Sequence, residues 1–313
     1  MTELPDLNDV DRFIPAKFRR MVSGHEPEGG VEGTDWLRDL PRLVSECASE
    51  WDLEPTGAVL HGMCAVVIPC RHDGDSVMLK VTWPHPEAAH EHLALRAWDG
   101  DGAVRLVAAD PSRWAMLLEA LDPERPLADV DVDESNRVIG DLLHHLDRPA
   151  FPQLVTLSTE CTRWAERMRV EGPRALPRRM AERAAAIFRE LGSADDIDAR
   201  LVNSDLHDEN VLAGDRAPWL AIDPKPVAGV PEFAIAPLMW NRLEEAIAAP
   251  SARNHLRRRL EIACEAGGFS EELARDWTFA RCALNAVWEN ERPDDADRDW
   301  ISHMVTVCKA MQD

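Results

Sequence analysis

Apolar residues change their spacing along the first third of the chain, and each spacing predicts a type of secondary structure. Between Trp36 and Trp51 they recur at every third or fourth position, which predicts a helix with one buried face. The next segment has short apolar runs separated by turns that contain Gly and Asp, a pattern typical of β-hairpins. We therefore expect three strands, at residues 58–60, 64–68 and 77–81.

A second helix is predicted at residues 87–98, after Pro84 and Pro86, and glycines just beyond it favour its end there. Two more apolar segments follow, at residues 104–108 and 114–119, and we interpret them as strands. Three strands, a helix and two strands in this order are expected for the small lobe of a kinase-like fold.

After Asp122 the chain becomes mainly helical. Apolar stripes with helical spacing lie at residues 138–146, 176–191 and 301–311. Short strands return between residues 201 and 223. The whole pattern predicts an α+β, two-lobed, protein-kinase-like fold, with a small β-rich N-lobe and a larger, mainly helical C-lobe.

The composition argues against several classes of protein. The chain has 57 acidic and 35 basic residues, a net charge of −22, whereas a nucleic-acid binder needs a positive face. No apolar run is long enough to span a bilayer, and because the first residues are acidic and polar we expect no signal peptide. Seven cysteines without a CxxC pair disfavour a zinc site or a disulfide framework. We expect a cytoplasmic protein that binds neither nucleic acid nor membranes.

Polar residues suited to phosphoryl transfer gather in the segment of short strands. Asp205 and Asn210 lie on a polar loop that runs into a strand, and Asp223 follows at the end of the next strand. In phosphoryl transfer one carboxylate accepts the proton of the attacking hydroxyl, while an amide oxygen and a second carboxylate hold Mg²⁺ against the phosphates. A surface loop rich in Asp and Asn is the alternative. The apolar runs on each side favour the first interpretation, because they place these groups near the ends of buried strands.

A lysine and a glutamate in the first third of the chain complete this set. Lys80 lies within the apolar strand at 77–81, and Glu91 lies on the otherwise apolar face of the helix at 87–98. A carboxylate on such a face needs a partner, and Lys80 is well placed to be that partner. The two residues predict the ion pair of kinases, in which the lysine binds the α- and β-phosphates. A lysine exposed at a sheet edge is the alternative.

Nine segments carry a resemblance to a known family. They are Gly33-Thr-Asp-Trp-Leu37, Leu40-Pro-Arg-Leu-Val44, Glu91-His-Leu-Ala-Leu-Arg-Ala-Trp98, Gly102-Ala-Val-Arg-Leu106, Met116-Leu-Leu-Glu-Ala-Leu-Asp122, Arg125-Pro-Leu127, Asp205-Leu-His207, Asn210-Val-Leu212 and Ala221-Ile-Asp-Pro-Lys225. They are spread along the chain, and the resemblance extends over most of it from about residue 33 to residue 245. The chain resembles the aminoglycoside phosphotransferase superfamily, and within it the streptomycin 6-phosphotransferase/hydroxyurea phosphotransferase group.

The resemblance implies a role for each candidate residue. The implied catalytic base is Asp205, the implied Mg²⁺ ligands are Asn210 and Asp223, and the implied nucleotide-binding residues are Lys80, Glu91, Glu119, Ala120 and Leu121. The last three belong to a linker that is implied to offer backbone groups to the nucleotide base. The expected cofactors are Mg²⁺ and ATP, with GTP as the alternative nucleotide.

These assignments divide the chain into three parts. Residues 1–35 contain Pro27, a Gly pair and few apolar residues, so we expect a loosely packed N-terminal arm. A nucleotide-binding N-lobe is expected at residues 36–121. The helical C-lobe, at residues 122–313, is expected to carry the catalytic loop and the acceptor site.

The chain departs from the family pattern at two places. The family usually has His-Gly-Asp at the catalytic loop, where this chain has Asn203-Ser204-Asp205. It usually has Gly-Asp-Pro-x-Tyr-Asp further on, where this chain has Gly229-Val-Pro-Glu-Phe-Ala234. Asn203 is still able to form hydrogen bonds, whereas Ala234 has no polar side chain. Either the loop is braced differently, or the chain is a divergent member with an unusual substrate or weak catalysis.

The predicted function is ATP- or GTP-dependent O-phosphotransfer to a hydroxyl of an antibiotic, conferring resistance. The antibiotic is an aminoglycoside such as streptomycin, or another natural product. Two alternatives stay open: a catalytically weak or silent kinase-fold binding protein, and a metabolic kinase acting on a sugar or a choline-like compound. The chain is expected to act as a monomer or dimer.

The acceptor is expected to carry positive charge. The second half of the chain is rich in carboxylates, including Glu244, Glu245, Glu261, Glu265, Glu289, Glu291, Asp294 and Asp295. An acidic cleft would steer a guanidinium or ammonium group and hold it by charge-assisted hydrogen bonds. The alternative is that these carboxylates only solvate helix faces.

Overall fold

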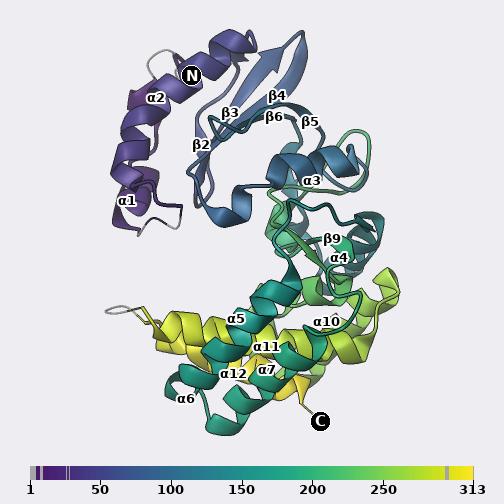
Figure 1. Ribbon diagram of the computed structural model, residues 1–313. Helices are drawn as coiled ribbons and strands as arrows, with labels where there is room; N and C mark the ends of the chain where they lie inside the picture. The colour runs from purple at the N-terminus through teal and green to yellow at the C-terminus, as the bar shows by residue number, and fades with distance from the viewer. Residues whose placement is uncertain (1–4, 8–9, 26, 28, 293–295, 313) are drawn as a thin grey trace. The chain divides into compact units, whose positions relative to one another are not determined.

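The computed structural model describes residues 5–7, 10–25, 27, 29–292 and 296–312 (Figure 1). The chain forms two compact units, of which the first ends at Asp122 and the second begins at Pro123. This division lies one residue beyond the expected boundary. The first unit contains a six-stranded sheet and the second is mainly helical, so the fold class is α+β as predicted.

The sheet of the first unit is antiparallel and has the strand order β1-β3-β4-β6-β5, with β2 paired to β3. Its strands are β1 (Glu54–Pro55), β2 (Leu60–His61), β3 (Ala65–His72), β4 (Asp75–Thr82), β5 (Leu106–Asp110) and β6 (Ala115–Glu119). The predicted strand at 58–60 is therefore displaced toward His61, and the one at 104–108 begins only at Leu106. The predicted helix at 87–98 consists of a short 3-10 turn, Pro86–Ala88, and the helix α3 (Glu91–Trp98).

The hairpin between β3 and β4 has the turn that its sequence predicts. His72 pairs with Asp75, so the loop consists of Asp73 and Gly74, whose φ values are 50° and 92°. Positive φ at both central residues is the type I′ turn, whose twist matches that of the two strands. The turn therefore fixes the register of β4 and with it the direction in which Lys80 points.

Side chains of β4 alternate between the two faces of the sheet. Val77, Leu79 and Val81 lie in one apolar cluster with residues of α2 (Gly33–Glu50). Lys80 points the other way and bonds to the first residue of α3. Because successive side chains of a strand point to opposite faces of the sheet, the apolar core lies on one face of β4 and Lys80 lies on the other.

The segment expected to be a loose arm packs into the first unit instead. It forms a 3-10 turn, Val10–Phe13, and the helix α1 (Ala16–Gly24). Its apolar residues Leu7, Val10, Ile14, Phe18 and Val22 are all buried in the cluster that α2 and the sheet share. From Val10 to Val22 they are four positions apart, which is a helical stripe that the low apolar content of this segment concealed. A Cβ at Gly33 would lie 2.3 Å from the carbonyl oxygen of Val22, so a glycine there lets α1 and α2 meet closely.

The second unit is built from nine described α-helices. They are α4 (Val132–His145), α5 (Leu157–Val170), α6 (Gly172–Ala175), α7 (Arg178–Leu191), α8 (Pro237–Trp240), α9 (Leu243–Ala248), α10 (Ala252–Gly267), α11 (Glu271–Asn290) and α12 (Arg298–Met311). In α11 the residues between Trp277 and Val287 are mostly buried, as expected for a helix in the centre of a bundle. Figure 1 shows α7 and α12 beside it.

Several of these helices begin at a residue whose side chain caps the first turn. The carboxylates of Asp131 and Asp297 and the hydroxyls of Ser251 and Ser270 accept hydrogen bonds from backbone N–H groups of α4, α12, α10 and α11. None of the helices in the described part of the chain is long and apolar enough to cross a membrane. All seven cysteines are free thiols, and all but Cys64 are buried.

Two small sheets position the catalytic segment in the second unit. One has the order β11-β10-β7 and the other the order β12-β9-β8. Their strands are β7 (Asp122–Pro126), β8 (Arg148–Pro149), β9 (Arg200–Asn203), β10 (Val211–Ala213), β11 (Leu220–Ala221) and β12 (Pro226–Gly229). The loop from β9 to β10 and the loop from β11 to β12 each join one sheet to the other, and these two loops hold the predicted chemistry.

Candidate active site

The predicted ion pair of the first unit is present and buried. The Nζ atom of Lys80 lies 2.6 Å from Oε1 and 2.8 Å from Oε2 of Glu91. Lys80 is 6% exposed and Glu91 is 2% exposed. Lys80 lies in the middle of the sheet, opposite Val67 on β3 and Met116 on β6, so it is not an edge lysine. Because both charges are removed from water, each depends on the other for its stability.

The linker predicted to bind the nucleotide base follows β6 directly. The backbone N–H of Glu119 donates to the carbonyl of Arg105 at 3.0 Å, and that of Ala120 donates to the carbonyl of Ser76 at 3.3 Å. The side chain of Glu119 also accepts from the N–H of Arg105 at 2.7 Å. Two of the three amide hydrogens in this linker are therefore used within the unit, so Leu121 is the residue whose N–H is best suited to a base.

In the second unit, Asp205 and Asn210 lie on the loop between β9 and β10. The loop contains a 3-10 turn, Asp208–Asn210, and the fully buried Leu206 anchors it. The Nδ2 atom of Asn210 donates to the backbone carbonyl of Asp205 at 3.3 Å and lies 3.0 Å from Nε2 of His207. These contacts occupy the amide nitrogen, so the amide oxygen of Asn210 is the atom left for a ligand.

Asp223 reaches the same end of the hairpin as Asn210. Val211 pairs with Ala221 across β10 and β11, and the N–H of Ile222 donates to the carbonyl of Asn210 at 2.9 Å. Asp223 is the next residue, is exposed and has a φ of 50°. Asp is among the residues that adopt this left-handed conformation most readily.

Asn210 and Asp223 have the donor chemistry that Mg²⁺ requires. An amide oxygen and a carboxylate are hard ligands, and Mg²⁺ commonly takes one or two such groups together with phosphate and water. Among the residues that the structure describes, no group of three or more His, Cys, Asp or Glu side chains is suited to hold a metal ion. The pair therefore fits an ion that binds together with nucleotide phosphates rather than alone.

Asn203 braces the catalytic loop in place of the usual histidine. Its side chain is 1% exposed, and its Oδ1 accepts from the N–H of Asp205 at 3.2 Å and from the N–H of Lys225 at 3.1 Å. The N–H and the hydroxyl of Ser204 each donate to the carbonyl of Lys225 at 2.9 Å. The end of β9 is thus fastened to the start of β12.

Arg281 supplies a second brace, which the sequence reasoning missed. From α11 its guanidinium donates to the carbonyls of Ser204 and Phe233, both at 3.0 Å. It also lies 4.2 Å from the ring centroid of Phe233 and 5.1 Å from that of Trp240. The neighbouring Ala234 is fully buried, so the polar contact that alanine lacks comes from an arginine on another helix. The sequence does contain one signal for this role, which was not used: Arg281 is the lone arginine in the apolar run from Trp277 to Trp288.

Lys225 is the other residue that the sequence reasoning left without a role. Its Nζ lies 3.0 Å from Oδ2 of Asp205, and the two side chains are 36% and 23% exposed. The lysine of the Asp-Pro-Lys segment thus forms an ion pair with the predicted catalytic base.

The carboxylates expected to attract a cationic acceptor are partly neutralised. Glu245 pairs with Arg242 at 2.6 Å, Glu289 with Arg292 at 3.2 Å, and Glu291 with Arg167 at 3.2 Å. Asp294 and Asp295, which were part of the same expectation, lie outside the described residues. Less free negative charge is therefore available to an acceptor than the composition suggested.

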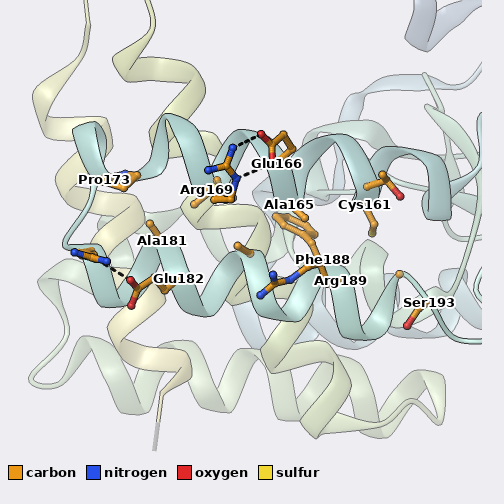
Figure 2. Close-up of a pocket in the computed structure, with 15 residues that line it drawn as sticks. Cys161, Ala165, Glu166, Arg169, Pro173, Ala181, Glu182, Phe188, Arg189 and Ser193 are labelled. Carbon is orange, nitrogen blue, oxygen red and sulfur yellow. Dashed lines mark hydrogen bonds and ion pairs between the residues drawn. The ribbon is translucent and has the colours of Figure 1, made fainter.

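A groove of about 790 Å³ lies along α5 and α7. Figure 2 shows the two helices side by side, with Ala165 and Phe188 between them and the ion pairs Glu166–Arg169 and Arg178–Glu182 along the rim. None of the predicted site residues lines this groove. Four of its five charged side chains pair with each other along α5 or along α7, and Arg189 is the fifth.

Comparisons with known proteins agree with this chemistry. A model of the aminoglycoside/hydroxyurea antibiotic resistance kinase family matches residues 50–292. Streptomycin 6-kinase from Streptomyces griseus is 38% identical over 285 residues, which cover 87% of this chain and 90% of that protein. Hydroxyurea phosphotransferase from Kitasatospora aureofaciens is 36% identical over 275 residues, or 84% of this chain and 77% of that protein.

Solved structures of low identity share the fold. Choline kinase LicA from Streptococcus pneumoniae has a TM-score of 0.58 at 14% identity and covers 87% of this chain and 98% of its own. Aminoglycoside phosphotransferase APH(4)-Ia has a TM-score of 0.53 at 14% identity and covers 86% of this chain and 98% of its own. These two confirm the predicted kinase-like fold. The family match and the close relatives go further: the chain belongs to the aminoglycoside/hydroxyurea antibiotic resistance kinase family and is a small-molecule phosphotransferase, as its sequence predicted.

Proposed function

We propose that this chain uses Mg²⁺ and ATP or GTP to phosphorylate a hydroxyl group of an aminoglycoside or a related natural product. One observation carries the proposal. Two adjacent loops of the second unit hold a carboxylate, Asp205, beside an amide oxygen and a second carboxylate, Asn210 and Asp223, through backbone hydrogen bonds. A base and two hard-oxygen ligands at neighbouring positions are what phosphoryl transfer requires of a protein.

Asp205 acts as the base. It accepts the proton of the acceptor hydroxyl, whose oxygen forms a bond to the γ-phosphorus. The bond from that phosphorus to the bridging oxygen breaks, and its electron pair stays with the nucleoside diphosphate. Because such transition states are loose, positioning and charge stabilisation contribute more than the strength of the base. The hydrogen bonds that fix the loop therefore contribute to the rate in addition to the carboxylate itself.

Asn210 and Asp223 are the residues that would hold a magnesium ion, together with phosphate oxygens of the nucleotide. When bound, the ion neutralises the charge that develops on the β- and γ-phosphates. The orientation of the Asn210 amide is set before any ligand arrives, because its nitrogen is already bonded to Asp205 and His207. The protein thus presents oxygen rather than nitrogen to the metal.

Lys80 binds the α- and β-phosphates, and Glu91 keeps its ammonium group in place. A lysine on a central strand has little freedom to reach elsewhere, and both carboxylate oxygens of Glu91 lie within 2.8 Å of it. The linker Glu119, Ala120 and Leu121 receives the nucleotide base. Carbonyls of this linker and the N–H of Leu121 serve as its hydrogen-bonding groups, since the other two N–H groups are used within the unit.

The acceptor is proposed to be a hydroxylated, cationic molecule of the aminoglycoside class. Its support is the name of the relative streptomycin 6-kinase, together with the net charge of −22. A catalytically silent binding protein is not favoured. At the first departure from the family pattern Asn203 still forms hydrogen bonds that brace the loop, and near the second departure Arg281 provides polar contacts. Likeness to a choline kinase concerns the fold and does not favour choline as the acceptor.

The test is nucleotide turnover against a panel of acceptors. Purified chain with Mg²⁺ and either ATP or GTP is incubated with streptomycin, with aminoglycosides of other scaffolds, with hydroxyurea and with choline. The product is identified by mass spectrometry. We expect phosphorylation of at least one aminoglycoside, lost in the Asp205→Ala variant. Efficient turnover of choline alone would reject the antibiotic acceptor and leave a metabolic kinase.

A further inference from the structure

We propose that Lys225 is a positioning residue of the transfer site. It holds one oxygen of the Asp205 carboxylate so that the other, Oδ1, receives the proton of the acceptor hydroxyl. This inference rests on the proposed function, in which Asp205 is the base.

The ion pair is built into the junction of two strands. The Nζ atom of Lys225 lies 3.0 Å from Oδ2 of Asp205. The backbone N–H of Lys225 and that of Asp205 donate to the same atom, Oδ1 of the buried Asn203, at 3.1 and 3.2 Å. The carbonyl of Lys225 accepts from the N–H of Ser204 at 2.9 Å. Both partners therefore start from fixed backbone positions, and the contact between their side chains does not depend on a flexible loop.

The contact distinguishes the two oxygens of the base. Oδ2 of Asp205 contacts the ammonium group, whereas Oδ1 accepts no hydrogen bond from any residue in the described part of the chain. A carboxylate that rotates freely presents either oxygen in several directions. Because Lys225 holds Oδ2, the rotation of the carboxylate is limited, and Oδ1 keeps one direction.

The choice of lysine over arginine supports this role. Only four of the 35 basic residues are lysines, at positions 17, 80, 225 and 309. Lys17 and Lys309 are exposed, whereas Lys80 and Lys225 each pair with a carboxylate of the candidate site. An ammonium group is a point charge that is suited to one oxygen, while the planar guanidinium tends to bind both oxygens of a carboxylate. An arginine at position 225 would therefore also cover Oδ1.

The experiment compares three variants of the full chain under the same assay. Lys225→Met removes the charge, Lys225→Arg keeps it, and Lys309→Met is the matched control at an exposed lysine of the same unit. We expect Lys225→Met to lower kcat about 10–100-fold, the usual scale for losing a hydrogen bond between charged groups. Nucleotide affinity, measured by calorimetry, and melting temperature stay close to wild type. Lys225→Arg is expected to be no more active than Lys225→Met, and Lys309→Met to be unchanged.

A double-mutant comparison separates positioning from a direct contact with phosphate. If Lys225 acts through the base, Lys225→Met causes no further loss in an Asp205→Asn background. A further loss there, or near wild-type activity of Lys225→Arg, would overturn the inference. A wild-type chain that transfers phosphate to no acceptor would instead reject the proposed function. Wild-type activity that Lys225→Met leaves intact would reject the role of Lys225 alone.

Discussion

The two groups of candidate residues are held by different kinds of interaction. In the first unit Lys80 and Glu91 form one buried ion pair, and both side chains are at most 6% exposed. In the second unit Asp205, Asn210 and Asp223 are partly or fully exposed, and hydrogen bonds to the backbone keep them in place. Substitutions in the first group should therefore affect both the stability of the protein and its chemistry, whereas substitutions in the second group should affect mainly the chemistry.

The difference follows from what each group has to do. A buried pair tolerates little movement, because either charge left alone in the interior is costly. In the proposed function the loop from β9 to β10 has to admit a hydroxyl, a metal ion and phosphates, which agrees with the partial exposure of Asp205 and Asn210. Its rigidity comes from Asn203 and Arg281 behind the loop. Substitutions in the two groups should therefore separate into effects on folding and effects on rate.

The largest effect on rate is expected at Asp205. Asp205→Ala should lower kcat about 10²–10⁴-fold, the usual contribution of a general base, and leave the melting temperature close to wild type. Steady-state transfer kinetics and thermal unfolding measure the two quantities. Glu209→Ala, at an exposed carboxylate on the same loop, is the control and should remain active. Near-normal transfer by a folded Asp205→Ala protein would remove the base from the mechanism.

The largest effect on stability is expected at the buried pair. Glu91→Ala should lower the free energy of unfolding by about 3–5 kcal/mol, because Lys80 is left as an uncompensated buried charge. The double variant Lys80→Met/Glu91→Leu should recover most of this loss, since an apolar pair of similar volume is often as stable. Denaturant unfolding measures both. Transfer activity should stay absent in the double variant, and its return would show that Lys80 does not bind phosphate.

Arg281, which braces the loop from α11, should affect the rate of transfer more than the stability of the protein, as the second group does. Arg281→Met removes the hydrogen bonds to the carbonyls of Ser204 and Phe233 but keeps much of the packing. We expect kcat to fall about 10–100-fold, on the scale of a lost charged hydrogen bond. Arg183→Met is the control: Arg183 pairs with Asp276 at 3.2 Å and lies 4.7 Å from the Phe279 ring centroid, but it makes no hydrogen bond to the catalytic loop in the described structure. Equal losses of activity in the two variants would point to general destabilisation instead.

The sequence predicted the features that depend on local spacing. The register of β4 and the stripe of α3 placed Lys80 and Glu91 together, because a strand period and a helix period are both visible within a few residues. The Asp73-Gly74 turn and the hairpin of β3 and β4 were predictable for the same reason, whereas the short strand β1 was not predicted. Asn210 and Asp223 lie at the same end of the β10–β11 hairpin, and a hydrogen bond ties Asn210 to the backbone of Asp205.

Features that depend on distant contacts were not predictable in this way. Arg281 braces Ser204 across 77 positions of sequence, and no local pattern specifies which loop a helix will meet. The burial of Val10 to Val22 depends on α2 and the sheet, which supply the apolar surface that the segment itself lacks. Likewise, the sequence does not indicate which arginines pair with the acidic residues of its second half. Charge counts describe composition, whereas pairing is decided by the fold.

The proposed metal ligands offer a smaller and more specific effect. Asp223→Asn removes one charge and keeps the backbone, because Asn tolerates the φ of 50° as readily as Asp. We expect affinity for the Mg²⁺–nucleotide complex to weaken on the order of tenfold, as changes at metal sites commonly do. Calorimetry with and without Mg²⁺ measures it. Affinity for the nucleotide without Mg²⁺ should be unchanged, and an equal loss in both titrations would mean that Asp223 contacts the nucleotide rather than the metal.

The smallest effect concerns charge at a distance. A cationic acceptor attracted by exposed carboxylates should have a Michaelis constant that rises a few-fold between about 10 mM and 150 mM salt, over which the Debye length falls from about 30 Å to about 8 Å. The rise should be modest, because Glu245, Glu289 and Glu291 already pair with arginines. The constant for nucleotide should change less, since Lys80 is buried and screened little by salt. Turnover of a neutral acceptor with no dependence on salt would contradict the cationic class and favour a neutral natural product.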